Sequence, residues 1–147
     1  MMLSGGIFAR VRKQCIALTV VVACSFLSSC GSTTKTRELA KRNVEQFHAQ
    51  LNAEQYAAIY AACDEKFHQA SSEADFTKLL DAVHKKLGSA QQSDLQNWRV
   101  AWLAGQGATI TLAYGTKFSE GSATETFVWH VKDDKASFTA TTLIRMI

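Results

Sequence analysis

The chain has 147 residues, no proline and a formal net charge of +3, from 16 basic and 13 acidic residues. This length suits one domain with its own hydrophobic core. The three basic residues Arg10, Arg12 and Lys13 precede any acidic residue. Without them the chain is close to neutral and has no basic stripe, so nucleic-acid binding is not expected.

The amino-terminal segment has the pattern of a secretory signal. An uncharged apolar run over about residues 14–26 follows the basic cluster. It is shorter than the roughly 20 residues that cross a bilayer and fits the apolar region of a signal peptide. The run ends in Leu27-Ser28-Ser29-Cys30, which resembles the lipobox of bacterial lipoproteins. We predict a signal peptide at residues 1–29 with a lipid on Cys30, the alternatives being a plain secretory signal cut elsewhere or an uncleaved anchor.

The lipobox resemblance implies a diacylglyceryl group on Cys30, usually with a third acyl chain. Each methylene that is buried in the bilayer adds about 0.8 kcal/mol to membrane affinity, so several chains hold the protein stably. Gly31 stands where an aspartate tends to retain lipoproteins of enteric-type bacteria at the inner membrane. We therefore expect a protein of the bacterial cell envelope, attached to the outer membrane and facing the periplasm.

The residues after the lipobox divide into a tether and a domain. Residues 30–36 hold the lipidated cysteine and small polar residues, which predict a flexible tether. The domain follows at residues 37–147. Its one cysteine, Cys63, has no partner for a disulfide, and the four histidines have no metal-ligand spacing. We expect no catalytic residues, no metal and no cofactor.

Three helices are predicted next. The spacing of Ala40, Val44, Phe47 and Leu51 predicts the first. Asn52 with Gln55 three residues later predicts the start of a second helix, whose apolar stripe consists of Tyr56, Ile59, Tyr60, Cys63 and Phe67. Ser72 and Asp75 predict the start of the third, which Gly88 ends and whose stripe consists of Phe76, Leu79, Leu80, Val83 and Leu87.

Four strands follow, at about 95–103, 108–118, 123–131 and 136–145. We predict a three-residue loop at Gly105-Gln106-Gly107 and two-residue loops at Glu120-Gly121 and Asp133-Asp134. These loops pair Trp102 with Ile110, Tyr114 with Phe127, and Val131 with Ala136.

This register puts an aromatic, uncharged face on one side of the sheet. The predicted inner face consists of Trp98, Val100, Trp102, Ile110, Leu112, Tyr114, Phe127, Trp129, Val131, Phe138 and Ile144. The outer face is rich in threonine and includes His130. The helix stripes can be buried only against the inner face. The predicted fold is α+β, with three N-terminal helices packed on one face of a four-stranded antiparallel meander sheet and no titratable acid or base inside except tyrosine and Cys63.

The element order resembles the nuclear transport factor 2-like (cystatin-like) superfamily. A more specific pattern consists of Tyr60, the segment Phe76 to Leu80, Leu87-Gly88 and the run Leu112-Ala-Tyr114…Phe118…Gly121…Glu125-Thr-Phe127-Val-Trp129. In these residues the chain resembles the DUF4019 and DUF3887 domains of bacterial exported proteins, over about residues 38–147. It implies a cone between helices and sheet, which we expect to be lined by Tyr56, Tyr60, Trp98, Trp102, Tyr114 and Trp129.

We expect this domain to be non-enzymatic and to bind a protein partner or a small apolar ligand. The outer sheet face is a candidate surface for a partner or for a homodimer, as in other members of the superfamily. The alternative is an enzyme of the isomerase or dehydratase type that uses the pocket tyrosines with His130; this requires His130 to point into the pocket. A purely structural, immunity- or inhibitor-like lipoprotein is a third alternative.

Overall fold

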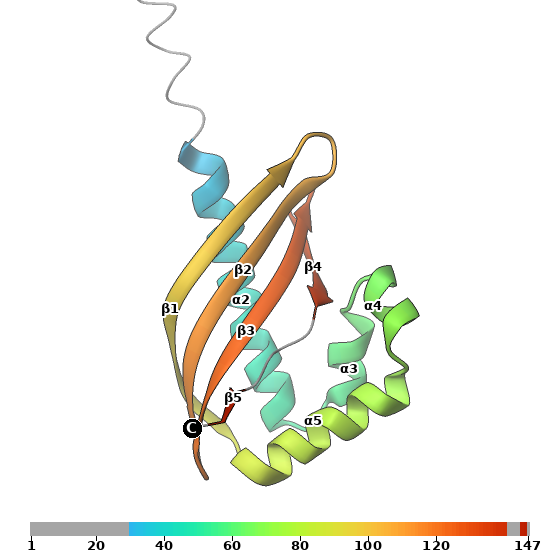
Figure 1. Cartoon of the computed structure of the whole chain (residues 1–147), viewed down its shortest axis with the longest axis vertical. Coiled ribbons are helices and arrows are strands. Elements are labelled where there is room, and N and C mark those ends of the chain that lie inside the picture. The colour runs from blue at the N-terminus through green and yellow to red at the C-terminus, as the bar shows by residue number, and fades with distance from the viewer. Residues whose placement is uncertain (1–29, 141–144, 147) are drawn as a thin grey trace, which may run out of the picture. The chain divides into compact units, whose positions relative to one another are not determined.

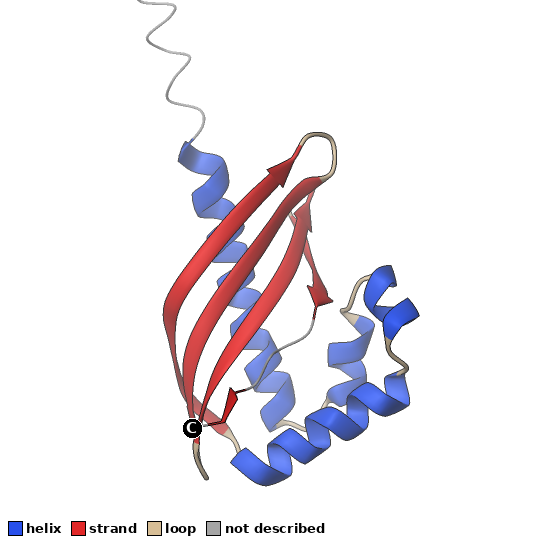
Figure 2. Cartoon of the chain, in the orientation of Figure 1, coloured by secondary structure: helices blue, strands red, loops and turns tan. Residues whose placement is uncertain are grey.

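The computed structural model describes residues 30–140 and 145–146. The chain divides into two parts between residues 34 and 35, and the part from residue 35 onward contains the sheet and the core. The elements are α2 (Cys30–Asn52), α3 (Tyr56–Ala61), α4 (Glu65–Ala70), α5 (Glu73–Leu87), β1 (Ala90–Leu103), β2 (Gly107–Phe118), β3 (Ser122–Lys132), β4 (Lys135–Ala140) and β5 (Arg145–Met146) (Figure 1). The predicted α+β order, helices first and then a four-stranded antiparallel meander, is confirmed (Figure 2).

The sheet runs in the order β1-β2-β3-β4, and the short β5 pairs with β3. Along β2 and β3 buried side chains alternate with half-buried ones, and the buried set includes Ile110, Leu112, Phe127 and Trp129. The faces of these two strands are therefore as predicted. The fourth predicted strand is divided between β4 and β5, and Ile144 lies outside the described residues.

The hairpin of β3 and β4 has the predicted register. Asp133 and Asp134 form its two-residue loop, with φ angles of 50° and 58°. Such a pair of positive angles belongs to the turn type whose twist fits a hairpin. Val131 pairs with Ala136, as predicted.

The other two hairpins differ from the predicted register by two residues. Tyr114 pairs with Glu125 instead of Phe127, because the last pair of this hairpin is Lys117 with Ser122, which leaves four unpaired residues, 118–121, where two were expected. Trp102 pairs with Ala108 instead of Ile110, because the three-residue loop begins at Ala104. A shift by an even number of residues leaves every side chain on its predicted face.

The second predicted helix is interrupted. It is divided into α3 and α4 by residues 62–64, which bond to the backbone of β4: the Asp64 N–H donates to the Phe138 carbonyl at 2.8 Å. The Asp64 side chain then caps α4 by accepting from the Phe67 N–H at 2.8 Å. Pairing with the exposed edge of β4 therefore replaces the helical bonds of this segment.

Two other helix ends differ from the prediction. Asn52 does not cap α3; its side chain instead makes two hydrogen bonds to the backbone of Ala90, at 2.8 and 2.9 Å. Helix α2 already begins at Cys30, so residues 31–36, expected as a flexible tether, are helical. Extending an existing helix by a turn costs less than starting one, which explains the longer helix. The predicted cap at Ser72 is present, since its hydroxyl accepts from the Asp75 N–H at 3.2 Å.

Two glycines of the β1–β2 hairpin give a matched test of this loop. Gly105 and Gly107 both have positive φ angles, 73° and 93°. A Cβ on Gly105 would meet no atom within 4 Å, whereas one on Gly107 would lie 2.4 Å from the Val131 carbonyl oxygen. We expect Gly105→Ala to lower the free energy of unfolding by about 1 kcal/mol, the usual cost of a left-handed alanine. Gly107→Ala should cost at least about twice as much, since it adds a clash with backbone. Urea unfolding measures both, and equal losses would contradict the described hairpin.

Candidate functional site

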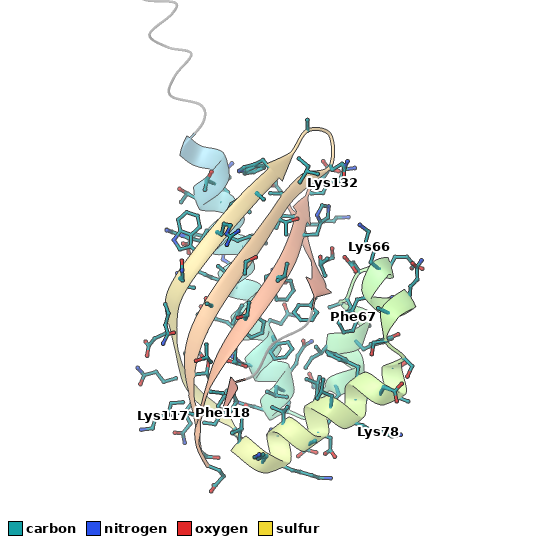
Figure 3. All side chains as sticks on the ribbon, in the orientation of Figure 1. Lys66, Phe67, Lys78, Lys117, Phe118 and Lys132 are labelled. Atoms are coloured by element: carbon teal, nitrogen blue, oxygen red, sulfur yellow. The ribbon has the colours of Figure 1, made fainter. Side chains whose placement is uncertain are left out.

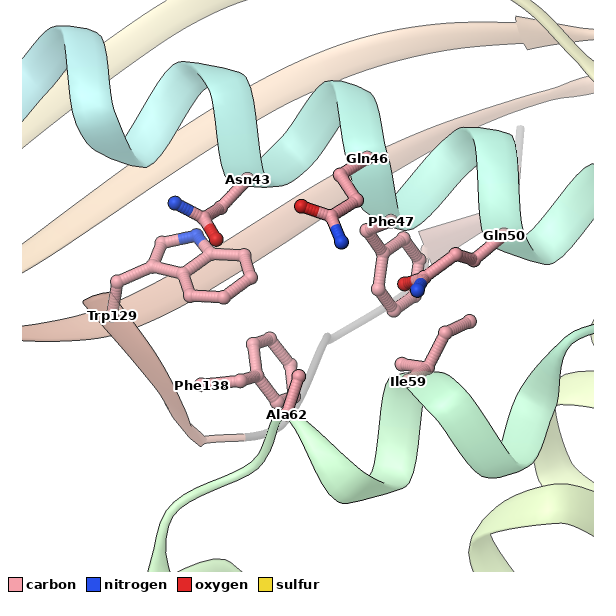
Figure 4. Close-up of a pocket in the computed structure, with 8 residues that line it drawn as sticks. All are labelled: Asn43, Gln46, Phe47, Gln50, Ile59, Ala62, Trp129 and Phe138. Carbon is pink, nitrogen blue, oxygen red and sulfur yellow. The ribbon is translucent and has the colours of Figure 1, made fainter. Parts of the chain in front are cut away.

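A small cleft opens between α2 and α3 (Figure 4). Its volume is about 30 Å³. Its large apolar side chains are those of Phe47 on α2, Ile59 on α3, and Trp129 and Phe138 on the sheet. Helix α2 adds three carboxamides along one edge of the cleft: Asn43, Gln46 and Gln50.

The three carboxamides share one face of α2 because they are spaced by three and four residues. Gln46 is exposed and Asn43 and Gln50 are half-buried. The Asn43 amide donates to the Leu39 carbonyl at 2.8 Å, which orients this side chain. A carboxamide carries both donors and an acceptor, as a peptide group does. This edge of the cleft can therefore bond to an extended peptide.

Trp129, which lines the cleft, has a buried hydrogen-bond donor that is not used. Its side chain is only 4% exposed, and its Nε1 has no hydrogen-bond partner among the described residues. A buried indole N–H normally has a partner, and leaving it unpaired costs about 1–3 kcal/mol. An acceptor that reached this N–H would remove this cost.

The six residues expected to line the cone lie in different places. Trp129 lines the cleft, while Tyr56 and Tyr114 are buried in the hydrophobic core, where burial raises the pKa of both hydroxyls. Tyr60 is half-buried and donates to the Ser71 carbonyl at 2.9 Å. Trp98 and Trp102 are 40% and 52% exposed. They lie on the inner side of β1, paired with Leu112 and Ala108, but no buried partner covers them fully.

The prediction of an uncharged interior is wrong. Glu125 is 1% exposed and His48 is also buried. Glu125 precedes Phe127 by two residues and so shares its face of β3, which the alternation of that strand alone could have revealed. His48 follows Phe47 on α2 and lies beside the rings of Phe118 and Phe127.

Four side chains from four elements form a closed hydrogen-bonded ring around Glu125. His48 Nε2 lies 2.8 Å from Glu125 Oε2, and His48 Nδ1 lies 3.3 Å from the Ser93 hydroxyl. The Ser93 hydroxyl lies 3.0 Å from that of Thr116, which donates to Glu125. The ring therefore connects α2 (His48), β1 (Ser93), β2 (Thr116) and β3 (Glu125).

Four hydrogen bonds need four protons. The two hydroxyls supply one each, so the pair of His48 and Glu125 must carry the other two. The pair is therefore either imidazolium with carboxylate or imidazole with carboxylic acid when all four bonds are made. The ring gives a hydrogen-bond partner to both nitrogens of His48, to one carboxylate oxygen of Glu125 and to both hydroxyls, and such pairing lowers the cost of burying polar groups.

His130 lies on the outer face of the sheet and not beside the tyrosines expected in the pocket. It pairs across the sheet with Thr109 and Ser137, on the face opposite to the buried Trp129 and Val131. There it borders a broad hollow with Thr109, Thr139 and Lys132, which is labelled in Figure 3. The arrangement that the isomerase or dehydratase alternative requires is not formed.

The thiol of Cys63 is buried. Burial, with a smaller effect of the Asp64 charge, raises its pKa from 9.0 to about 12. Because the thiolate is the reactive form, we expect native protein at pH 8 to react with a disulfide reagent at Cys63 only as fast as it unfolds. The raised pKa stabilises the fold below about pH 9, and this contribution is lost as the pH rises toward 12. Thiol labelling with and without urea tests this, and rapid labelling of the native protein would contradict it.

The described residues include no cluster of three or more His, Cys, Asp or Glu that could hold a metal. In the same part of the chain no helix is long and apolar enough to cross a membrane.

The fold is thus that of a small α+β domain in which helices precede and cover an antiparallel sheet. The family model of the DUF4019 proteins, which are described as proteins of unknown function, matches residues 43–141. The chain belongs to this family, as its resemblance predicted. A comparison with curated proteins found no match.

Proposed function

We propose that this chain is a bacterial lipoprotein, anchored through a lipid on Cys30 at the periplasmic face of the outer membrane, whose domain binds a protein partner. The partner would lay an extended segment along the carboxamides of α2 and insert one apolar side chain into the cleft. The domain acts by binding and performs no catalysis.

The anchor is supported by the sequence around Cys30. The basic residues, the uncharged run and Leu27-Ser28-Ser29-Cys30 follow one another in the order of a lipoprotein signal. Helix α2 begins at that cysteine, so the domain follows the proposed attachment point directly.

The cleft supports a protein partner over a small apolar ligand because of its size and its polar edge. One water needs about 10–15 Å³, so a cavity of about 30 Å³ admits the end of a side chain but not a whole small molecule. The carboxamides of Asn43, Gln46 and Gln50 match the donors and acceptors of a peptide backbone. The observation that carries the proposal is the unpaired Nε1 of Trp129, which an acceptor on the partner would bind.

Site-specific photocrosslinking in cells tests this proposal. A photoreactive residue in place of Gln46 should give a discrete adduct with an envelope protein. Ala62→Leu fills the cleft and should abolish the adduct, since Ala62 borders the cleft. Ala61→Leu is the matched control, because the neighbouring Ala61 is exposed and does not border the cleft.

The proposal fails if no adduct forms, or if Ala62→Leu and Ala61→Leu reduce it equally. An adduct that persists in both variants would place the partner elsewhere, such as on the threonine-rich outer face of the sheet.

A further inference from the structure

We propose that Trp98, Trp102 and Leu103 insert into the lipid headgroup region and form a second membrane contact beside the lipid on Cys30. This inference rests on the anchoring in the proposed function. It concerns the end of the β1–β2 hairpin, which the cleft and the buried ring do not involve.

The hairpin end exposes an unusual amount of apolar surface. Trp98 and Trp102 lie two positions to either side of Val100 on one face of β1, and Leu103 ends the strand. Each of these three side chains is 40% exposed or more. Two large aromatic residues so close together on an edge strand are unfavourable in water, and clustered exposure of this kind marks an interaction surface.

Chain length brings this patch within reach of the anchor. The Arg37 guanidinium lies 5.3 Å from the centre of the Trp98 ring. Arg37 is seven positions after Cys30, so the two residues are at most about 23 Å apart in any conformation. Trp102 and Leu103 are four and five residues from Trp98 along an extended strand, or about 13–17 Å. These lengths allow the hairpin to reach a bilayer that holds Cys30.

The charge next to the patch suits an anionic lipid surface. The segment 35–42 of α2 carries the basic residues Lys35, Arg37, Lys41 and Arg42 and one acidic residue, Glu38. Lys35 and Arg42 are exposed. Basic residues beside a membrane are attracted to anionic headgroups, and tryptophan prefers the interface because its ring is apolar and its N–H is polar. The basic residues and the tryptophans therefore favour lipid over a second copy of the chain as the partner of this patch.

Fluorescence quenching by brominated lipid tests the inference on the full lipidated protein. The protein is reconstituted into vesicles of phosphatidylcholine and phosphatidylglycerol, with and without bromine on the acyl chains, and floated on a density gradient. We expect the floated wild type to lose tryptophan emission in brominated vesicles. Trp98→Phe with Trp102→Phe should abolish this loss, since the remaining Trp129 is buried in the core. Phosphatidylcholine alone should give weaker quenching, because it lacks the anionic headgroup.

The outcomes separate the patch from the anchor. Protein that floats with the vesicles but is not quenched overturns the membrane contact and leaves the anchor intact. The same conclusion holds if crosslinking of this protein then shows that a second copy covers the patch. Equal quenching of the wild type and the double variant also overturns it. Protein that carries no acyl mass and does not float counts against the anchor instead.

Discussion

Replacing Glu125 by leucine is expected to lower the free energy of unfolding by about 2–4 kcal/mol. The substitution removes the acceptor for both His48 and Thr116 and leaves their polar atoms buried without partners. Loss of one partner from a buried charged or hydrogen-bonded pair has this cost. Urea unfolding followed by circular dichroism measures it.

The matched control is Glu45→Leu, the same change at an exposed position of α2, which should alter stability by less than about 0.5 kcal/mol. Replacing His48 and Glu125 together by leucine should cost less than the two single losses combined, because neither partner then remains unpaired. Additive losses, or a Glu125→Leu effect no larger than that of the control, would show that the ring is not formed.

Phe138→Ala is expected to destabilise the domain by about 3–5 kcal/mol, the usual cost of truncating a buried phenylalanine. The ring of Phe138 packs against those of Phe47, Phe67 and Trp129, with centroids 5.1–6.2 Å apart. Its backbone also bonds to Ala62 and Asp64, so this residue connects the sheet to the segment between α3 and α4.

Leu79→Ala provides the comparison for Phe138→Ala. The apolar stripe of the third predicted helix includes Leu79, yet this side chain is 52% exposed. We expect a change of less than about 0.5 kcal/mol in the free energy of unfolding. Thermal unfolding of both variants distinguishes the two residues, and similar shifts would contradict the described packing of α5.

Strand alternation and helical spacing were sufficient to predict the fold, because both depend on local periodicity. A register shift of two residues leaves each side chain on its predicted face of the sheet. Tyr114, for example, points inward as predicted although it pairs with Glu125 instead of Phe127. Exact register was not predictable, since it depends on loop length, and the unpaired segment 118–121 carries no strong signal. The break between α3 and α4 was missed for a related reason: it depends on pairing with Phe138, which is distant in sequence.

The buried ring and the cleft differ in how far the sequence could reveal them. Glu125 follows the alternation of β3, so its burial was open to prediction, whereas its partner His48 depends on how α2 is rotated against the sheet. The cleft depends on the packing of α2 against α3, and its unpaired Trp129 donor has no sequence signature. Trp98 and Trp102 lie on the predicted face, but no pattern shows where the helices stop covering an edge strand.

The measurement that tests the central claim most directly is the intact mass and amino-terminal sequence of the protein taken from bacterial membranes. The account predicts a chain that begins at Cys30 and carries the added mass of a diacylglyceryl group, with or without a further acyl chain; Cys30→Ala should lose this mass and leave the membrane. A chain that retains residues 1–29, or that begins at another residue without acyl mass, would contradict it.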